Sequence, residues 1–349
     1  MFNNKLFARF CIDRNLKIST INGYASALKL YSLFCKMSIN DLINEAHHDE
    51  DKGVSIKYRR IKRHLIEYRS YLLSNLSPGA TKTYFSKIKT FYSHFDVELP
   101  YLPAAKYSVD YESYYNDLPT KDHINQALSI SSNEMRAIIT FMATSGTAKA
   151  ETLSLTVNDF INATKEYHDN NGLDNILNSL EKRSDVIPTW YLKRIKTNKY
   201  YYTFNHPEAS KEIVKYLKKR QNLDLKDKLF PLSPSLLLTR FQQINDKFEW
   251  GFKGNYRFFR SHTLRKFHAS NIGLSAEDID SLQGRSKNMT HNTYIKPNPN
   301  KLKKIYVRSM ENISLINNEI SRNTSQNEIK SYHQTEFNIS INIFLLSND

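Results

Sequence analysis

The segment from residue 99 to residue 119 divides this chain into two unlike parts. Pro100 and Pro103 disfavour regular structure there, and the tyrosine-rich run that follows has no clear period. The residues before this segment show only helical spacing, whereas those after it combine helical patterns with an alternating, strand-like run. A length of 349 residues also suits two domains. The sequence therefore predicts a helical domain over 1–98, a linker over 99–119, a mixed domain over 120–310 and a tail over 311–349.

The helical domain contains one strongly basic stretch. A long helix is expected from about Ser55 to Leu76, and its first turns carry five cations: Lys57, Arg59, Arg60, Lys62 and Arg63. Cations at a helix N-terminus oppose the helix dipole, so their placement is mildly unfavourable on local grounds. The stretch is either a surface that faces DNA or a solvated helix start. We expect DNA contact, because the whole chain is basic.

The net charge indicates what kind of molecule the chain binds. The formal charge of +15 and the pI near 9.5 point to a polyanion. Two cysteines, Cys11 and Cys35, are too few for a disulfide framework or a four-cysteine zinc site, and they suit a reducing compartment. No run approaches the length of a membrane span, and the first residues lack the apolar core of a signal peptide. A cytoplasmic protein associated with the nucleoid is the expectation, with no metal and no membrane partner.

A second basic group combines residue types that suit phosphate chemistry. His262 and Arg265 are three residues apart, so a helix would place them on one face. Arg285 and Tyr294 follow within the next thirty residues or so. Arginine offers a planar fork of donors that matches phosphate oxygens. A tyrosine hydroxyl among such donors can attack phosphorus, because the donors stabilise the charge that develops on the phosphate. A stray His and Arg on a solvated helix face is the alternative.

Residues 185–204 alternate as a β-hairpin does, with a turn at 196–199. The hairpin carries four cations near its end: Lys193, Arg194, Lys196 and Lys199. They lie either at a solvent-exposed hairpin end or against a polyanion.

The pattern His262-x-Leu264-Arg265, then Leu282-x-Gly284-Arg285, then Tyr294 ten residues after the glycine resembles the tyrosine recombinase (phage integrase) family. The resemblance implies a helical SAM-like core-binding domain joined to a mixed α/β catalytic domain, mainly α with a small β-sheet. It implies that His262 and Arg265 hold the scissile phosphate and that Tyr294 becomes joined to DNA. Arg285 takes an assisting position usually held by His or Trp. The family's hairpin lysine would be Lys196, as general acid, with Lys193, Arg194 and Lys199 as backbone contacts.

One box departs from the family pattern. Residues 144–155 resemble the first catalytic box, but Ala148 stands where that family has an arginine, and Lys149 is one residue later. One step along a helix rotates a side chain by about 100°, so Lys149 needs a register change to substitute. Lysine is also a point charge rather than a fork. Repair by Lys149, natural decay and an engineered replacement of the arginine all remain open.

The implied activity is site-specific recombination of double-stranded DNA through a 3′-phosphotyrosyl intermediate, as for the integrase of a mobile element. No cofactor is implied. The family assembles tetramers on paired sites, and its C-terminal segments dock on adjacent protomers. The tail, with its alternating run 337–343, is therefore a candidate exchange segment. The alternatives are a catalytically impaired DNA-binding relative, type IB topoisomerase-like relaxation, and a generic basic DNA-binding protein.

Overall fold

The structure is a computed structural model that describes residues 4–105, 114–169, 172–285 and 298–315. The chain forms two compact units, Met1–Glu112 and Ser113–Asp349, which divide inside the predicted linker. Most described residues are helical and the sheets are small, so the predicted fold class is confirmed. Tyr294 and the tail strand expected at 337–343 lie outside the described residues. Within the described ranges, no helix combines the length and apolarity that crossing a bilayer requires.

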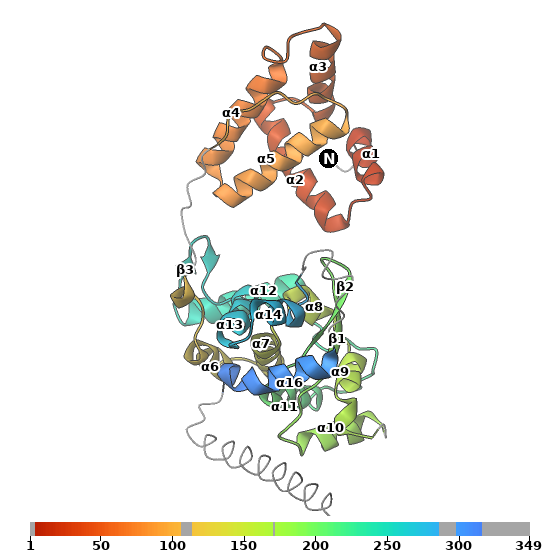
Figure 1. The fold of residues 1–349 in the computed structure, drawn as a ribbon, viewed down its shortest axis with the longest axis vertical. Coiled ribbons are helices and arrows are strands. Elements are labelled where there is room, and N and C mark those ends of the chain that lie inside the picture. The colour runs from red at the N-terminus through yellow and green to blue at the C-terminus, as the bar shows by residue number, and fades with distance from the viewer. Residues whose placement is uncertain (1–3, 106–113, 170–171, 286–297, 316–349) are drawn as a thin grey trace, which may run out of the picture. The chain divides into compact units, whose positions relative to one another are not determined.

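The first unit is wholly helical where it is described (Figure 1). Helices α2 and α4 both pack on α5. Tyr24, Leu28 and Tyr31, which are spaced three and four residues apart on α2, are buried in this core. The helices are α1 (Lys5–Asp13), α2 (Ile18–Cys35), α3 (Ile39–Asp51), α4 (Arg60–Asn75) and α5 (Pro78–His94).

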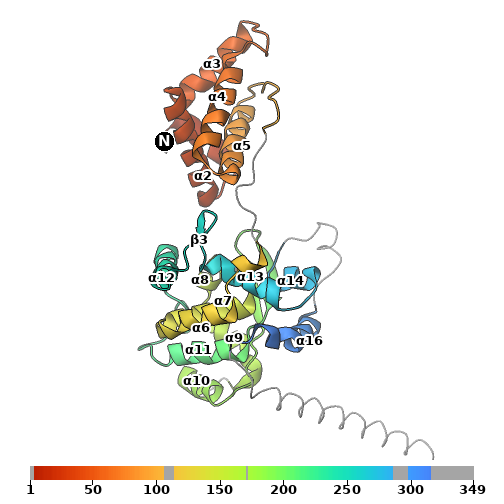
Figure 2. The same cartoon turned by 90° about the vertical axis from the view of Figure 1, so that its left-hand side faces the viewer.

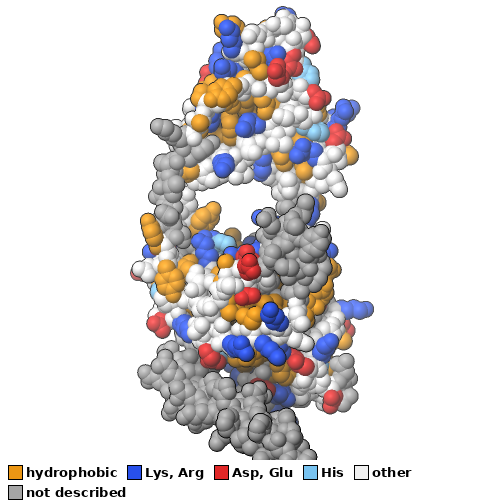
Figure 3. All heavy atoms as spheres, in the orientation of Figure 1, with side chains coloured by type: hydrophobic (Ala, Val, Ile, Leu, Met, Phe, Trp, Pro, Cys, Tyr) orange, Lys and Arg blue, Asp and Glu red, His pale blue; other side chains and the backbone are white. Residues whose placement is uncertain are grey.

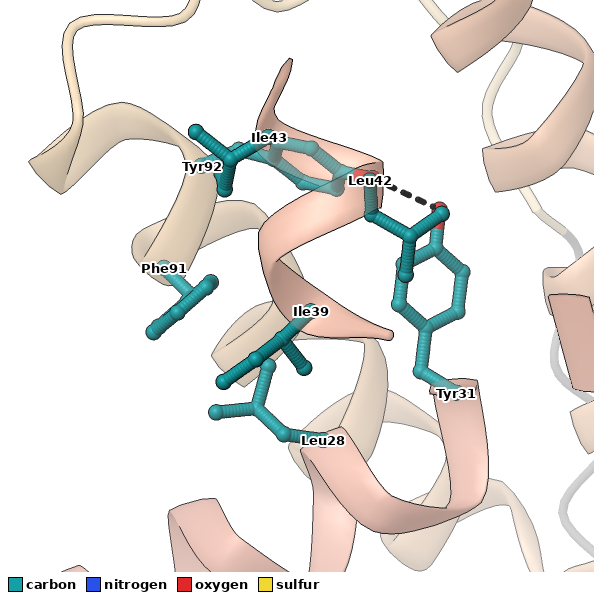
Figure 4. A pocket seen from close by; sticks show the side chains of 7 residues that line it. All are labelled: Leu28, Tyr31, Ile39, Leu42, Ile43, Phe91 and Tyr92. Carbon is teal, nitrogen blue, oxygen red and sulfur yellow. Dashed lines mark hydrogen bonds between the residues drawn. The ribbon is translucent and has the colours of Figure 1, made fainter. Parts of the chain in front are cut away.

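A small apolar pocket in this core contains two tyrosine hydroxyls (Figure 4). The hydroxyls of Tyr31 on α2 and Tyr92 on α5 lie 3.2 Å apart and hydrogen-bond to each other. Buried polar groups need such partners, because an unpaired hydroxyl loses its bonds to water without replacement. Burial raises the pKa of both tyrosines well above its usual value. The pair is therefore neutral and joins two helices of the first unit.

Helix α4 begins later than predicted, at Arg60 instead of about Ser55. The carboxylate of Asp49, at the end of α3, accepts a 2.8 Å hydrogen bond from the backbone N–H of Arg60 and so caps the helix. The same carboxylate accepts a 2.7 Å bond from the Arg60 guanidinium, which also pairs with Glu45. Local spacing could not reveal this cap, because its donor and acceptor belong to different helices. The carboxylates also offset the unfavourable position of cations at the helix start.

Replacing Asp49 by alanine is expected to destabilise α4 by about 2 kcal/mol, because it removes a cap and leaves Arg60 without its buried partner. Hydrogen exchange of the α4 amides in the full chain measures this. Asp51→Ala, at the exposed end of α3, the helix that also carries Asp49, is the matched control with little expected effect. The Arg60 guanidinium lowers the pKa of Asp49. Asp49 therefore stabilises the fold above the unfolded-state pKa of about 4, and its contribution is lost as pH falls through the lower folded pKa. Equal protection in Asp49→Ala and wild type at neutral pH would contradict this role.

The second unit is organised around α7, which lies between α11 and α13 (Figures 1 and 2). Every side chain of α7 from Ala137 to Ser145 is buried, so the helix is covered on all sides. The helices of this unit are α6 (Lys121–Ser129), α7 (Asn133–Ser145), α8 (Lys149–Ser154), α9 (Val157–Ala163), α10 (Leu173–Glu181), α11 (Pro207–Leu217), α12 (Pro234–Lys247), α13 (Ser261–Asn271), α14 (Ala276–Leu282) and α16 (Pro299–Ser309). Single 3₁₀ turns are η1 (Tyr115–Asp117), η2 (Lys165–Tyr167) and η3 (Met310–Ile313).

Two antiparallel hairpins complete the second unit: β1 (Trp190–Arg194) with β2 (Lys199–Thr203), and β3 (Phe252–Lys253) with β4 (Tyr256–Arg257). The first strand begins at Trp190, not near residue 185 as the alternation suggested. Val186 and Ile187 are buried without joining the ladder, and Pro188 has no N–H to donate to one. The packed unit reaches at least Leu315, which is buried, so it extends past the predicted domain end at residue 310.

Candidate functional site

Helix α13 positions two of the predicted site residues. Its N-terminus is fixed by Thr263, whose hydroxyl accepts a 3.1 Å bond from the backbone N–H of Arg260. Leu264 and Phe267 are buried against the core, which sets the rotation of the helix. His262 is partly exposed at the start of α13, and Arg265 lies one turn further on. The predicted His–Arg spacing therefore does lie on a helix.

Arg265 is a buried cation that joins three elements. Its side chain is only 6% exposed, and its Nη1 donates a 2.7 Å bond to the carbonyl of Gly146, at the end of α7. Its Nη2 donates another 2.7 Å bond to the carbonyl of Gln283, just after α14. Burial and the nearby Arg194 lower its pKa to about 10, so it stays charged at neutral pH. Two carbonyl bonds fix the plane of the guanidinium, as a preorganised anion site requires.

A buried polar pair, Gln283 and His268, lies against the backbone of Arg265. The side-chain amide of Gln283 lies 3.1 Å from the carbonyl of Arg265 and 3.1 Å from Nδ1 of His268. Complete burial and the charge of Arg265 lower the pKa of His268 to about 3, so this histidine is neutral. Its Nδ1 therefore accepts from the amide, and the ring proton is assigned to Nε2. Gln283 thus binds Arg265 through both its backbone and its side chain.

Gly146 is the residue that allows this close packing. It ends α7 in the left-handed region at φ 65°, which favours glycine. A Cβ atom there would lie 2.6 Å from Nδ1 of His268 and 2.7 Å from Nε2 of Gln283. Gly284, at φ 57°, also leaves no room for a side chain, because a Cβ there would lie 2.5 Å from the ring of Tyr201. Both glycines are therefore required by neighbouring side chains as well as by backbone conformation.

The β1–β2 hairpin brings one cation to this group. Nη1 of Arg194 donates a 2.6 Å bond to the same carbonyl of Gln283 that binds Arg265. Lys196 lies exposed in the turn between the strands, and Lys199 is exposed at the start of β2. Lys193 points to the other side of β1, 5.6 Å from the centre of the Tyr200 ring. Of the four hairpin cations, Arg194 is the one with a described bond to the Arg265 group.

His262 and Arg285 are more exposed than Arg265 and lie close enough for electrostatic interaction with it. Partial burial lowers the pKa of His262, and the charges of Arg260, Lys266, Arg265 and Arg285 lower it further. The imidazole is therefore neutral at pH 7. Arg285 is exposed and lies 3.5 Å from the carboxylate of Asp280. Its charge also acts on Arg265 and His268, which places it in the same electrostatic neighbourhood.

The first box has the predicted departure and no visible repair. Ala148 precedes α8, and Lys149 is the first residue of that helix, half-buried. Glu151, three residues after Ala148, is buried, and its Oε2 has no partner among the described residues. The structure brings Arg265, Arg194 and Gln283 into direct contact, but it gives Lys149 no described bond to any of them. Tyr294 cannot be placed, since it lies outside the described residues.

Comparison with solved structures identifies this arrangement of elements. No family profile matches the sequence, and no curated protein matches it. A lambda integrase dimer bound to a COC′ core site matches 84% of this chain and 97% of its own, at 13% identity and a TM-score of 0.53. A lambda integrase tetramer on a Holliday junction matches 84% of this chain and 78% of its own, at 14% identity and a TM-score of 0.52. XerH recombinase in a post-cleavage complex with a palindromic difH substrate matches 85% and 82%, at 15% identity and a TM-score of 0.50.

The chain has the tyrosine recombinase fold.

Within this recombinase fold, the basic stretch of the first unit is used differently from the prediction. Arg59 is largely buried and pairs with Glu50 and Glu98, while Arg60 pairs with Asp49 and Glu45. Both side chains therefore hold the unit together. The other three are less engaged: Lys57 and Arg63 are exposed, and Lys62 is half-buried. On the face drawn in Figure 3, cations and anions of the first unit are interspersed rather than segregated.

Two buried residues that hold Arg265 in place, Gln283 and His268, do not belong to any of the predicted sequence patterns. In the pattern Leu282-x-Gly284-Arg285, Gln283 is the unspecified residue, and no sequence pattern includes His268. A signal was available, because both are polar residues among the apolar positions that pack helices α13 and α14. Buried polar residues usually occur with a partner, so two of them in adjoining helices predict a pair.

Proposed function

We propose that this chain is a site-specific DNA recombinase of the integrase type. The observation that carries the proposal is the buried guanidinium of Arg265, fixed by two carbonyls within the tyrosine recombinase fold. A buried cation held by neutral acceptors suits an anion that arrives from outside, and the chain's charge of +15 suits DNA. His262 and Arg285 lie beside it, and Tyr294 follows nine residues after Arg285 in the sequence.

The proposed reaction is a transesterification at phosphorus. The phenol of Tyr294 gives its proton to water, and its oxygen attacks the scissile phosphate and forms a 3′-phosphotyrosyl bond. The bond to the 5′ oxygen breaks, and that oxygen leaves as a hydroxyl after receiving a proton, which we assign to Lys196. Arg265, His262 and Arg285 stabilise the charge on the phosphate oxygens. Attack by the 5′ hydroxyl of a partner strand reverses the chemistry, so no metal ion or nucleotide has to supply energy.

The proposal extends to the partners and the two units. We assign double-stranded DNA as the substrate, with Lys57, Lys62 and Arg63 of the first unit and Lys193 and Lys199 of the hairpin as backbone contacts. The lambda integrase structure on a Holliday junction is a tetramer. A homotetramer on paired sites is therefore our proposal for this chain, and a mobile element is the proposed source of the sites.

A second candidate has one specific observation in its favour. Ala148 offers no cation at the first box, which suits a relative that binds DNA without cleaving it. Strand exchange separates the candidates. The full chain is footprinted on fragments from its own genomic neighbourhood, and two copies of a bound fragment are then supplied. Exchanged strands support the recombinase, while relaxation of supercoils without exchange points to a topoisomerase. Binding with neither product identifies the impaired relative.

A further inference from the structure

We propose that Arg194 is the second guanidinium of the phosphate site, acting beside Arg265 on the same phosphate. This inference rests on the proposed function and names a residue that would contact the reacting group. The carrying observation is that Arg194 and Arg265, which are 71 positions apart in the sequence, donate to one and the same carbonyl oxygen, that of Gln283.

The hairpin register directs Arg194 inward. Side chains along a strand alternate between its two faces. Trp190 and Leu192 of β1 are buried and Arg194 is half-buried, whereas the intervening Tyr191 and Lys193 are exposed. Arg194 therefore lies on the core-facing side of β1. It is the last residue of the strand, and its side chain reaches the carbonyl of Gln283. Lys193 carries the same charge on the opposite face.

The shared carbonyl sets the separation of the two cations. The Gln283 oxygen is 2.6 Å from Nη1 of Arg194 and 2.7 Å from Nη2 of Arg265. Because both bonds end on one atom, the two nitrogens lie no further apart than these bonds laid end to end. That separation lets each guanidinium donate to a different oxygen of one phosphate group. The carbonyl thus acts as a fixed spacer between two forks.

The charge balance of this pair calls for an anion. Neither Arg194 nor Arg265 forms an ion pair with an acidic side chain in the ranges 4–105, 114–169, 172–285 and 298–315. The nearby acid Glu151 is buried and acts on Arg265 through space only. Two like charges this close repel each other, and burial strengthens the repulsion. An incoming phosphate between the two guanidinium groups removes that cost.

This assignment also accounts for Ala148. If Arg194 supplies the second guanidinium from the hairpin, the site does not need a cation from the first box. Lys149 then has no register change to make. The phosphate then has two guanidinium groups to bind it, that of Arg265 from α13 and that of Arg194 from β1.

The test measures binding of inorganic phosphate to the full chain. Thermal unfolding is followed by tryptophan fluorescence, which reports the second unit alone, because Trp190 and Trp250 are the two tryptophans of the chain. Phosphate is raised at constant ionic strength with chloride as the balance, and the apparent Kd follows from the shift in Tm. Wild type and Arg240→Ala, which removes an exposed cation from α12, should show the same Kd. Arg194→Ala and Arg265→Ala should each bind phosphate about tenfold more weakly, the loss typical of a charge-assisted bond.

A further variant, Arg194→Gln, separates phosphate binding from a structural role. Arg194→Gln removes the charge and keeps a shorter amide donor on the core-facing side of β1, so it should fold better than Arg194→Ala and bind phosphate as weakly. A lower Tm with an unchanged Kd in Arg194→Ala or Arg194→Gln would show that Arg194 only tethers the hairpin, and the proposal would be wrong. No phosphate dependence in wild type would overturn it as well.

The outcomes also distinguish this proposal from the proposed function. The same variants are tested for covalent adducts on a nicked DNA fragment that the wild type binds. A wild-type rate in Arg194→Gln, with adducts forming normally, overturns the role of Arg194 and leaves the recombinase intact. No adduct from any variant, with the tenfold phosphate pattern present, supports the Arg194–Arg265 pair and counts against the recombinase. A loss of about 10²-fold in Arg194→Gln but not in Arg240→Ala supports both.

Discussion

Replacing Arg265 by alanine is expected to slow formation of a protein–DNA adduct by about 10³-fold, while binding of the DNA fragment weakens far less. In the proposed reaction the guanidinium stabilises charge that develops on the phosphate. Its loss also leaves the carbonyls of Gly146 and Gln283 without their buried donor. The adduct rate is measured on nicked DNA by denaturing gel.

Two further variants show how Arg265 acts. Arg265→Lys keeps the charge but cannot reach two carbonyls with one planar fork, so we expect it to lose most of the rate as well. Arg240→Ala removes a cation from α12, where the side chain is exposed and lies 3.4 Å from Gln243. It should retain the wild-type rate. A full rate in Arg265→Lys would show that charge alone matters and would contradict the clamp described above.

The second large effect is on stability. Gly146→Ala is expected to destabilise the second unit by about 3 kcal/mol. The left-handed backbone costs an alanine about 1 kcal/mol, and the new Cβ would collide with His268 and Gln283. Urea unfolding followed by fluorescence of Trp190 and Trp250 measures the change.

Gly251 provides a matched control for this substitution. It has the same φ of 65° and belongs to the same unit, but a Cβ there would meet nothing within 4 Å. Gly251→Ala should therefore cost only the backbone part, about 1 kcal/mol. Equal losses in the two variants would mean that the Gly146 packing contributes nothing beyond conformation. The adduct rate of Gly146→Ala should also fall, because Arg265 binds the carbonyl of this residue.

Most of the fold can be predicted from the periodicity and local spacing of the sequence. The apolar stripe of α2, the helical placement of His262 and Arg265, and the hairpin after residue 189 all follow from patterns within a few residues of each other. The start of α4 does not, because its cap is the carboxylate of Asp49 on another helix. The resemblance to recombinases, carried by residues 262–294, is matched by the fold that the structure shows.

The inner part of the site could not be predicted from the sequence. The carbonyl of Gln283 receives Arg194 from β1 and Arg265 from α13, and no short-range pattern indicates that these three meet. For Arg59 and Arg60, a clear local pattern is present but does not reveal their tertiary partners. As a run of charge they predicted DNA contact, but their acidic partners Glu50 and Asp49 are on another helix. In both cases the deciding contact is tertiary.

The most direct measurement of the central claim is covalent trapping with Tyr294. Wild type, Tyr294→Phe and Ala148→Arg are incubated with nicked fragments on which the protein leaves a footprint, and the products are separated on a denaturing gel. The recombinase account predicts an adduct from wild type that survives denaturation, that protease digestion reduces to a peptide on the 3′ end, and that is absent in Tyr294→Phe. With Arg194 as the second guanidinium, Ala148→Arg should bring little gain. An adduct of equal yield in Tyr294→Phe, or none from any variant on DNA that each one binds, would contradict the account.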